Sequence, residues 1–245
     1  MMATRYYVGT SGWHYEHWRE RFYPRDLAKS AWLDHYSRSF TTVEVNNSFY
    51  RLPSEKAFLA WKEWSPAGFI FALKVNRFIT HIKRLRDAAE AVANFMARAR
   101  LLGEKMGPLL FQLPPQMKRD DDRLEEFLSV LPRDTENVFE FRNRTWLVDP
   151  VFDLLRRSGA GLCIYDMPDF TTPLVTTTGF AYVRFHGGEQ LYGGCYSDDL
   201  LQEWARRITG FGVPRTYAYF NNDIEGFAVR NALTLRRLLE GTGSR

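Results

Sequence analysis

The sequence predicts an α/β protein of the (β/α)8 TIM-barrel class, with residues 1–245 forming one domain. Three observations support this prediction: short apolar segments with alternating side chains recur along the chain, amphipathic helical segments separate most of them, and eight strand segments are present. Strands that alternate with helices favour a parallel sheet, and eight such units can close without exposed edges. The length of 245 residues and the 45% apolar content suit a single domain of this class.

Strands are predicted where apolar residues alternate or form short runs bounded by turn residues. The eight segments cover residues 6–10, 42–46, 69–74, 108–113, 137–142, 161–165, 180–186 and 216–220. Helices are predicted from apolar spacings of three and four residues and from capping residues such as Ser54. They cover residues 27–39, 54–64, 86–102, 120–131, 148–158, 197–208 and 225–240, so the helix after the sixth strand is expected to be short or missing.

The fifth predicted strand changes from apolar to charged toward its end. Val138, Glu140 and Arg142 alternate with apolar residues and therefore share one face. Because an ion buried without a partner is costly, Glu140 and Arg142 are expected to pair, to meet other polar groups or to face a wet cavity. A strand that becomes ionic at its carboxyl end is typical of the mouth of an α/β barrel.

Polar side chains also mark the ends of the other predicted strands. If all strands run in the same direction, one barrel mouth collects Glu44, Asn46, Lys74, Gln112, Glu140, Arg142, Asp166, Arg184, His186, Asn222 and Asp223. Several ionisable groups at one end favour a wet pocket. The alternative is a ring of internal ion pairs that closes the barrel top, although apolar layers would do so at a lower desolvation cost.

These groups divide into candidates for proton transfer and candidates for anion binding. Carboxyl and imidazole groups can act as acid or base, and those available are Glu44, Glu140, Asp166, Asp223 and His186, with the two glutamates preferred. Cationic groups expected to hold a phosphate or carboxylate are Lys74, Arg142 and Arg184. His186 could instead be a metal ligand or a structural histidine, and His81, on a loop after the third strand, is a second candidate.

Two turns that follow the last strands are candidates for backbone anion binding. Gly187-Gly188 and Asn221-Asn222 follow the seventh and eighth strands, where barrel enzymes often bind phosphate through backbone N–H groups. They could equally be turns that only redirect the chain. Aromatic residues near strand ends could form a stacking wall for a ligand, although such residues more often cap a core; they are Trp13, Tyr15, Tyr50 and Trp146.

The sequence predicts no specific cofactor. A divalent metal is possible because suitable donors occur at His81, His186, Glu44, Glu140 and Asp166. No local motif such as H-E-x-x-H is present, and nearby lysine and arginine would repel the ion. Cys163 and Cys195 show neither zinc-site nor disulfide spacing.

The charge of the chain favours an anionic partner. The formal net charge is +4 and the sequence pI is about 9.1. Many basic residues occur as pairs on predicted helices, which is typical of a solvated face, so a small anionic molecule is the expected partner and nucleic acid remains possible. No apolar run suits a membrane helix and the N-terminus lacks a signal-peptide core, so no membrane partner and a cytoplasmic location are expected. The oligomeric state is not indicated by the sequence.

Several blocks of the sequence resemble a known family. They include Gly9-Thr-Ser-Gly-Trp13, Val43-Glu-Val-Asn46, Ile79-Thr-His81, Glu140-Phe-Arg142, Tyr182-Val-Arg-Phe-His-Gly187 and Tyr219-Phe-Asn-Asn-Asp223. On these blocks the chain resembles the YecE-like family, a domain of unknown function with a TIM-barrel fold. The resemblance implies the fold and no established reaction. The family is also similar, at the level of fold alone, to metal-using sugar isomerases and abasic-site endonucleases.

The leading hypothesis from the sequence is an enzyme that acts by acid/base chemistry on a small anionic, hydroxylated substrate, as a hydrolase, lyase or isomerase. The alternatives are a nucleic-acid binding or processing protein and a noncatalytic metabolite-binding protein, both using the same mouth. Replacing Glu140 with Gln is expected to abolish activity without lowering stability. A strongly lowered melting temperature would instead favour the ring of ion pairs.

Overall fold

A computed structural model describes residues 4–188 and 190–242, and their strands form a sheet in the order β1-β9-β8-β6-β5-β4-β3-β2. The strands are β1 (Arg5–Thr10), β2 (Thr42–Val45), β3 (Ile70–Lys74), β4 (Met106–Leu113), β5 (Asn137–Phe141), β6 (Gly161–Met167), β8 (Phe180–Phe185) and β9 (Arg215–Phe220), with the short β7 (Phe170–Thr171) antiparallel to β6. The neighbouring pairs β1–β9, β8–β9, β3–β4, β4–β5 and β5–β6 are all parallel. The predicted (β/α)8 barrel class is therefore confirmed.

Helices separate the parallel strands along the chain. They are α1 (Trp32–Ser37), α2 (Asn47–Tyr50), α3 (Glu55–Trp64), α4 (Ala89–Ala99), α5 (Asp121–Val130), α6 (Asp149–Ser158), α7 (Asp198–Gly210) and α8 (Phe227–Thr242). No helix lies between β6 and β8, as the sequence predicts, because the chain turns back there and pairs β7 with β6. None of the helices in the described residues has the length and apolarity needed to cross a membrane.

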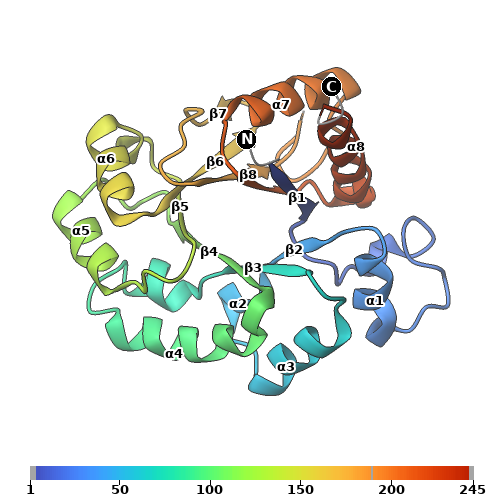
Figure 1. The fold of residues 1–245 in the computed structure, drawn as a ribbon, viewed down its shortest axis with the longest axis horizontal. Helices are drawn as coiled ribbons and strands as arrows, with labels where there is room; N and C mark the ends of the chain where they lie inside the picture. The colour runs from blue at the N-terminus through green and yellow to red at the C-terminus, as the bar shows by residue number, and fades with distance from the viewer. Residues whose placement is uncertain (1–3, 189, 243–245) are drawn as a thin grey trace. The chain divides into compact units, whose positions relative to one another are not determined.

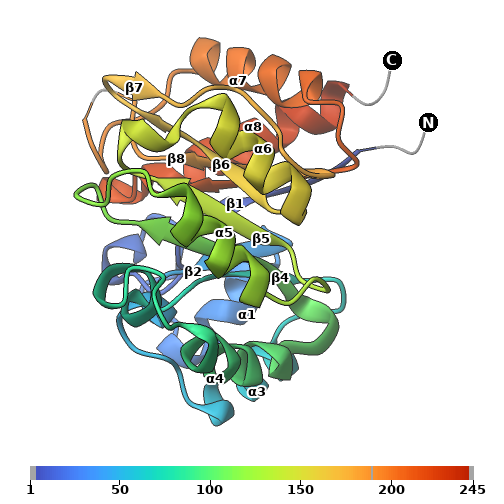
Figure 2. The ribbon, with the colours of Figure 1, turned by 90° about the vertical axis from the view of Figure 1, so that its left-hand side faces the viewer.

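The chain divides into two compact units. The first unit comprises Met1–Glu44, Ile164–Leu174 and Gly179–Arg245, and the second comprises Val45–Cys163 and Val175–Thr178. In the first unit α7 and α8 pack side by side (Figure 1). In the second unit α5 and α6 are neighbours (Figure 2). The single domain expected for residues 1–245 stays a prediction.

Capping residues fix several helix ends as the sequence indicates. Ser54 accepts a hydrogen bond from Ala57 N at the start of α3, and Asp120 accepts one from Arg123 N at the start of α5. These side chains satisfy backbone N–H groups that have no partner within the helix. Gly159 ends α6 with a φ of 66°, a left-handed conformation that glycine adopts without steric penalty.

Two predicted helices are wrong in extent. The segment predicted as a helix over 27–39 is a 3-10 turn, Lys29–Ala31, followed by the six-residue α1. The carbonyl oxygen of Leu27 accepts hydrogen bonds from the side chains of Arg19 (3.0 Å) and Trp32 (3.3 Å), which occupies a group that a longer helix would need. The helix predicted from residue 86 begins only at Ala89, because Asp87 has a φ of 44°.

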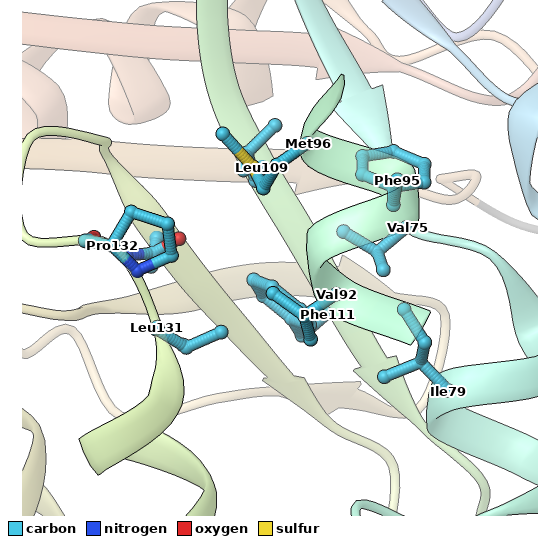
Figure 3. Close-up of a pocket in the computed structure, with 10 residues that line it drawn as sticks. Val75, Ile79, Val92, Phe95, Met96, Leu109, Phe111, Leu131 and Pro132 are labelled. Atoms are coloured by element: carbon cyan, nitrogen blue, oxygen red, sulfur yellow. The ribbon is translucent and has the colours of Figure 1, made fainter. Parts of the chain in front are cut away.

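Apolar spacing nevertheless located the buried faces correctly. Figure 3 shows side chains from α4 and β4 that line a narrow apolar crevice within the second unit, and the crevice leaves no room for a water molecule. Val92, Phe95 and Met96 lie there at helical spacing, and all three are buried. The crevice is therefore packed core.

Candidate active site

The carboxyl ends of β1, β9 and β8 are aligned in the first unit. Thr10 is in register with Phe220, and Phe185 is in register with the same residue. Just beyond them, the backbone N–H of Ser11 donates to Phe220 O (2.9 Å) and that of Asn221 donates to Phe185 O (2.7 Å). Side chains that follow these strands are therefore held along one edge, where barrel enzymes carry their functional groups.

Glu44, at the end of β2, is fully buried and accepts three hydrogen bonds. Ser11 Oγ (2.8 Å) and Arg184 Nη2 (2.8 Å) donate to its Oε1, and the Tyr182 hydroxyl donates to its Oε2 (2.6 Å). Tyr182 and Arg184 are two residues apart on β8, so they share a face, as the sequence predicts. Burial raises the pKa of Tyr182 well above its ordinary value, which keeps the hydroxyl protonated as a donor.

This arrangement commits both oxygens of Glu44 to internal contacts. The ion pair with Arg184 is buried on both sides. Such pairs are destabilising to break, because one charge is then left without its counterpart in a dry environment. Glu44 and Arg184 therefore form the kind of internal ion pair that the sequence offered as an alternative to a wet pocket. Proton transfer by Glu44 stays a prediction.

Asp223, just after β9, is held by two side chains that the sequence interpretation missed. Trp18 Nε1 donates to its Oδ1 (2.6 Å), and His17 Nε2 lies 3.1 Å from its Oδ2. The Asp223 side chain remains 17% exposed and that of His17 44% exposed, so solvent reaches the pair. Burial raises the pKa of Asp223 to about 6, with His17 and Trp18 acting in the opposite direction.

Tyr15 links this carboxyl group to the Glu44 contacts. Its hydroxyl donates to Ser11 O (2.5 Å). Its ring packs against the rings of His17 and Trp18, with centroid distances of 5.4 Å and 5.0 Å, respectively. Burial raises the pKa of Tyr15, and the negative charges of Asp223 and Glu44 raise it further. We call Ser11, Tyr15, His17, Trp18, Glu44, Tyr182, Arg184 and Asp223 the Asp223 cluster. The only signal for its missed members was the dense group of aromatic residues after the first strand.

Asp166 and His186 lie at the ends of β6 and β8 in the same unit. The backbone N–H of His186 donates to Asp166 O (2.9 Å), and Asp166 accepts side-chain hydrogen bonds from Thr171 (2.5 Å) and Tyr196 (3.0 Å). Burial raises the pKa of Asp166, which makes it a second carboxyl group of altered acidity. His186 is fully buried, with Nδ1 3.1 Å from Asn221 Nδ2.

The two turns predicted to bind an anion, after β8 and β9, contain residues that shape or stabilise the loops. Gly187 has a φ of 130°, and a Cβ there would lie 2.0 Å from Gln190 O, so the turn requires glycine. Asn222 Nδ2 donates to Gly194 O (2.9 Å) and to Asn231 Oδ1 (2.8 Å). Phosphate binding by these turns stays a prediction.

The second unit holds its own polar group around Glu140. Gln112, its register partner on β4, donates to Glu140 Oε1 (2.8 Å), and Arg142 pairs with the same oxygen. Glu140 is fully buried and pairs with Arg142, which is the first of the three arrangements that the sequence left open for these charges. Proton transfer by Glu140 and anion binding by Arg142 stay predictions.

The remaining predicted ligand-binding residues differ in exposure. Trp13 is buried, which favours the core-capping interpretation for it. Tyr50 is 72% exposed and available to a ligand. Asn46 is half-buried, and Lys74 Nζ lies 4.1 Å from the centroid of the Phe49 ring. The Lys74 contact is a cation–π interaction.

The described residues contain no group of three or more His, Cys, Asp and Glu side chains placed to hold a metal ion. Within the described residues neither Cys163 nor Cys195 forms a disulfide. The donors considered from the sequence are instead committed to hydrogen bonds such as those to Glu44 and Asp166.

Comparison with known proteins places the chain in a family. The profile described as "Protein of unknown function DUF72" matches residues 7–245. The chain belongs to the DUF72 family. This confirms the resemblance to the YecE-like proteins, which are members of DUF72.

Relatives of this DUF72 protein cover it almost end to end. It is 24% identical to the UPF0759 protein YunF of Bacillus subtilis (strain 168), over 96% of this chain and 94% of YunF. A DUF72 structure from Thermotoga maritima MSB8 is similar with a TM-score of 0.85 and 32% identity, covering 96% of this chain and 99% of that one. One from Enterococcus faecalis V583 has a TM-score of 0.83 at 17% identity, covering 96% of each chain, and supports the fold alone.

Proposed function

We propose that this DUF72 protein is an acid–base enzyme in which Asp223 transfers a proton on a small anionic, hydroxylated substrate. The observation that carries the proposal is the state of Asp223: a partly exposed carboxyl group whose pKa is raised to about 6 by burial. A group with a pKa near the working pH can both take up and release a proton during turnover, which is the requirement for general acid–base catalysis.

The contacts of Asp223 suit this role. The Trp18 N–H holds one carboxyl oxygen in a fixed position, and His17 adjusts acidity through the other. The Glu44–Arg184 ion pair fixes Ser11, whose carbonyl oxygen in turn receives the Tyr15 hydroxyl. We therefore assign Glu44 a positioning role and keep Asp166 as a second acid–base candidate. Hydrolysis, elimination and isomerisation are all reactions that one such carboxyl group can assist.

The test is a comparison of Asp223→Asn with the wild-type protein on a panel of sugar phosphates and hydroxy acids. We expect kcat to fall by about a hundredfold or more in the variant, since Asn cannot exchange a proton. Asp26→Asn, which changes an exposed aspartate, is the matched control and should leave the rate unchanged. A rate that survives Asp223→Asn would overturn the proposal.

The pH dependence tests the same assignment. If ionised Asp223 is the base, the rate should rise as the pH passes through about 6. His17 lowers the pKa of Asp223, so His17→Asn should move that midpoint to higher pH. A midpoint unaffected by His17→Asn would show that another group controls the profile.

Measuring the stability of Asp223→Asn shows whether a lost rate could come from misfolding of the variant. The folded-state pKa of Asp223, about 6, exceeds its ordinary value of 3.8, so its stabilising contribution is present below about pH 4 and is lost as the pH rises through 6. Asn is neutral throughout, so Asp223→Asn should be at least as stable as the wild type above pH 6. Urea unfolding at pH 5 and pH 8 checks this expectation.

A further inference from the structure

A cavity of about 360 Å³ lies beside α8 in the first unit. It is bounded by one face of α8, by Asp198 at the start of α7, and by Arg21 and Phe22. Helices α7 and α8 pack side by side (Figure 1). None of the residues that line the cavity belongs to the Asp223 cluster. A water molecule takes up about 30 Å³, so the space suits a small organic molecule better than a single ion.

One face of α8 supplies two arginines to this cavity. Arg230, Thr234 and Arg237 follow one another at helical spacing, so they lie on the same side of the helix. Arg237 Nη2 donates to Thr234 Oγ1 (3.2 Å), which lies one turn earlier. The two guanidinium groups therefore come from one helix face and border the same space.

Arg21 reaches the same cavity from a distant part of the chain. Its side chain lies against Gly226, the last residue of the 3-10 helix Ile224–Gly226 that precedes α8. A Cβ at Gly226 would be 3.8 Å from Arg21 Cδ and 3.9 Å from Arg21 Cβ, which are ordinary contact distances. Tertiary packing thus adds a third guanidinium group to the two from α8.

The three arginines of the cavity form no ion pair with an acidic side chain in the part of the chain that the structure describes. Their neighbour Arg236 differs, because it pairs with Glu240 (3.5 Å). Asp198 also lines the cavity, but among the described residues it forms no ion pair either. Three guanidinium groups and one carboxylate leave the lining with a net positive charge of two.

Apolar side chains line the cavity as well. On α8, Val229 is buried and Leu233 is half-buried. The half-buried Phe22 ring packs edge-on against the Trp18 ring, with centroids 5.6 Å apart. Such side chains offer no hydrogen bond to a charged group, but they can cover the apolar part of a bound molecule. The cavity therefore combines cationic groups with an apolar surface.

We propose that this cavity binds a phosphate monoester whose organic part is apolar. A phosphate monoester is close to a dianion at neutral pH, which matches the net charge of the lining. Its three terminal oxygens can accept charge-assisted hydrogen bonds from three guanidinium groups, whereas a carboxylate has only two oxygens. Phe22, Val229 and Leu233 cover the organic part. The site is defined by its own residues and does not depend on catalysis by Asp223.

Calorimetric titration of the whole protein tests the class of ligand. The probes are phenyl phosphate, inorganic phosphate and phenylacetate, at low ionic strength and about pH 7.5, where the monoester is mostly a dianion. We expect phenyl phosphate to bind at least about tenfold more tightly than either of the others, because it alone combines a dianion with an apolar group. The proposal fails if phenyl phosphate does not bind or if another probe binds as tightly.

Charge variants locate the binding site. Arg230→Gln and Arg237→Gln should each weaken phenyl phosphate binding by about tenfold or more, because each removes a charged donor. Arg206→Gln is the matched control: it removes an exposed arginine of α7 that does not line the cavity, so the affinity should stay unchanged. Asp198→Asn should tighten binding by roughly two- to fivefold, because it removes a negative charge beside the phosphate.

The gain expected for Asp198→Asn separates a binding site from a general loss of structure, because a poorly folded variant does not gain affinity. Far-ultraviolet circular dichroism checks that every variant is folded. Equal losses in Arg206→Gln and the two α8 variants would overturn the assignment. Unchanged affinity in both α8 variants, or weaker binding by Asp198→Asn, would overturn it as well.

Discussion

At the scale of single residues, Glu44 and Asp223 show how surroundings separate two carboxyl groups. Glu44 is fully buried and saturated by Ser11, Tyr182 and Arg184. Asp223 keeps a path to solvent and a pKa raised to about 6. Glu44 lies near the end of one predicted strand and Asp223 follows another, so the sequence identifies both as candidates. The sequence could not show which of the two is better suited to proton transfer, because the residues that bury each carboxyl group and donate hydrogen bonds to it come from distant segments.

Glu44→Gln should therefore act mainly on stability. The change removes the carboxylate charge that Glu44 presents to Arg184 in a dry environment, and breaking a buried pair of this kind costs about 3–5 kcal/mol. Urea unfolding followed by tryptophan fluorescence measures the loss. Asp134→Asn, which breaks the exposed pair with Arg100, should change little. An unchanged stability of Glu44→Gln would show that the pair is not structural and would return Glu44 to the list of catalytic candidates.

The same reasoning changes the expectation for Glu140. The sequence predicts that Glu140→Gln removes activity without lowering stability. The structure encloses Glu140 completely and pairs it with Arg142. With this geometry we expect Glu140→Gln to lower the melting temperature. That outcome would support the alternative of internal ion pairs.

At the scale of elements, local signals located most strands and helix ends. The caps Ser54 and Asp120 and the terminal Gly159 act within a few residues of where they stand. The elements that were missed are short or irregular: α2, β7 and the π-helix Phe78–Ile82. The π-helix placed His81 in a regular turn rather than the expected loop. Such elements have too few residues to show a hydrophobic period.

Gly159→Ala tests the helix end directly. A Cβ at Gly159 would meet nothing within 4 Å, so only the φ of 66° opposes alanine there. We expect a loss of about 1 kcal/mol in the free energy of unfolding. Gly210→Ala is the matched control, because Gly210 lies in α7, also has open space around its Cβ position and has no positive φ. It should be stabilising by up to about 1 kcal/mol, and an equal loss in both variants would contradict the argument.

At the scale of the whole molecule, several of the paired basic residues on the helices form ion pairs with nearby acidic residues. Arg156 pairs with Asp153 (2.6 Å) and Arg236 with Glu240 (3.5 Å), both within their own helices. Arg157 lies 3.7 Å from Glu125 on the neighbouring helix. These contacts agree with a solvated helix face and give no support to a nucleic-acid surface.

We therefore expect no measurable binding to single-stranded or abasic oligonucleotides. Fluorescence anisotropy between about 50 and 200 mM salt measures it, because phosphate contacts make affinity fall steeply over this range. The expected outcome is no anisotropy change at the lower salt concentration. Tight binding that declines steeply with salt would favour the nucleic-acid hypothesis instead.

The sequence by itself determined the fold class, the positions of the parallel strands and the residues at their carboxyl ends. These follow from alternation, helical spacing and capping, which operate over a few residues. Only the tertiary structure decided which of those residues act together. Trp18 reaches Asp223 across 205 positions of the chain, and Tyr182 reaches Glu44 across 138. Desolvation and hydrogen bonding at that range set the acidity of each group, and no local pattern encodes them.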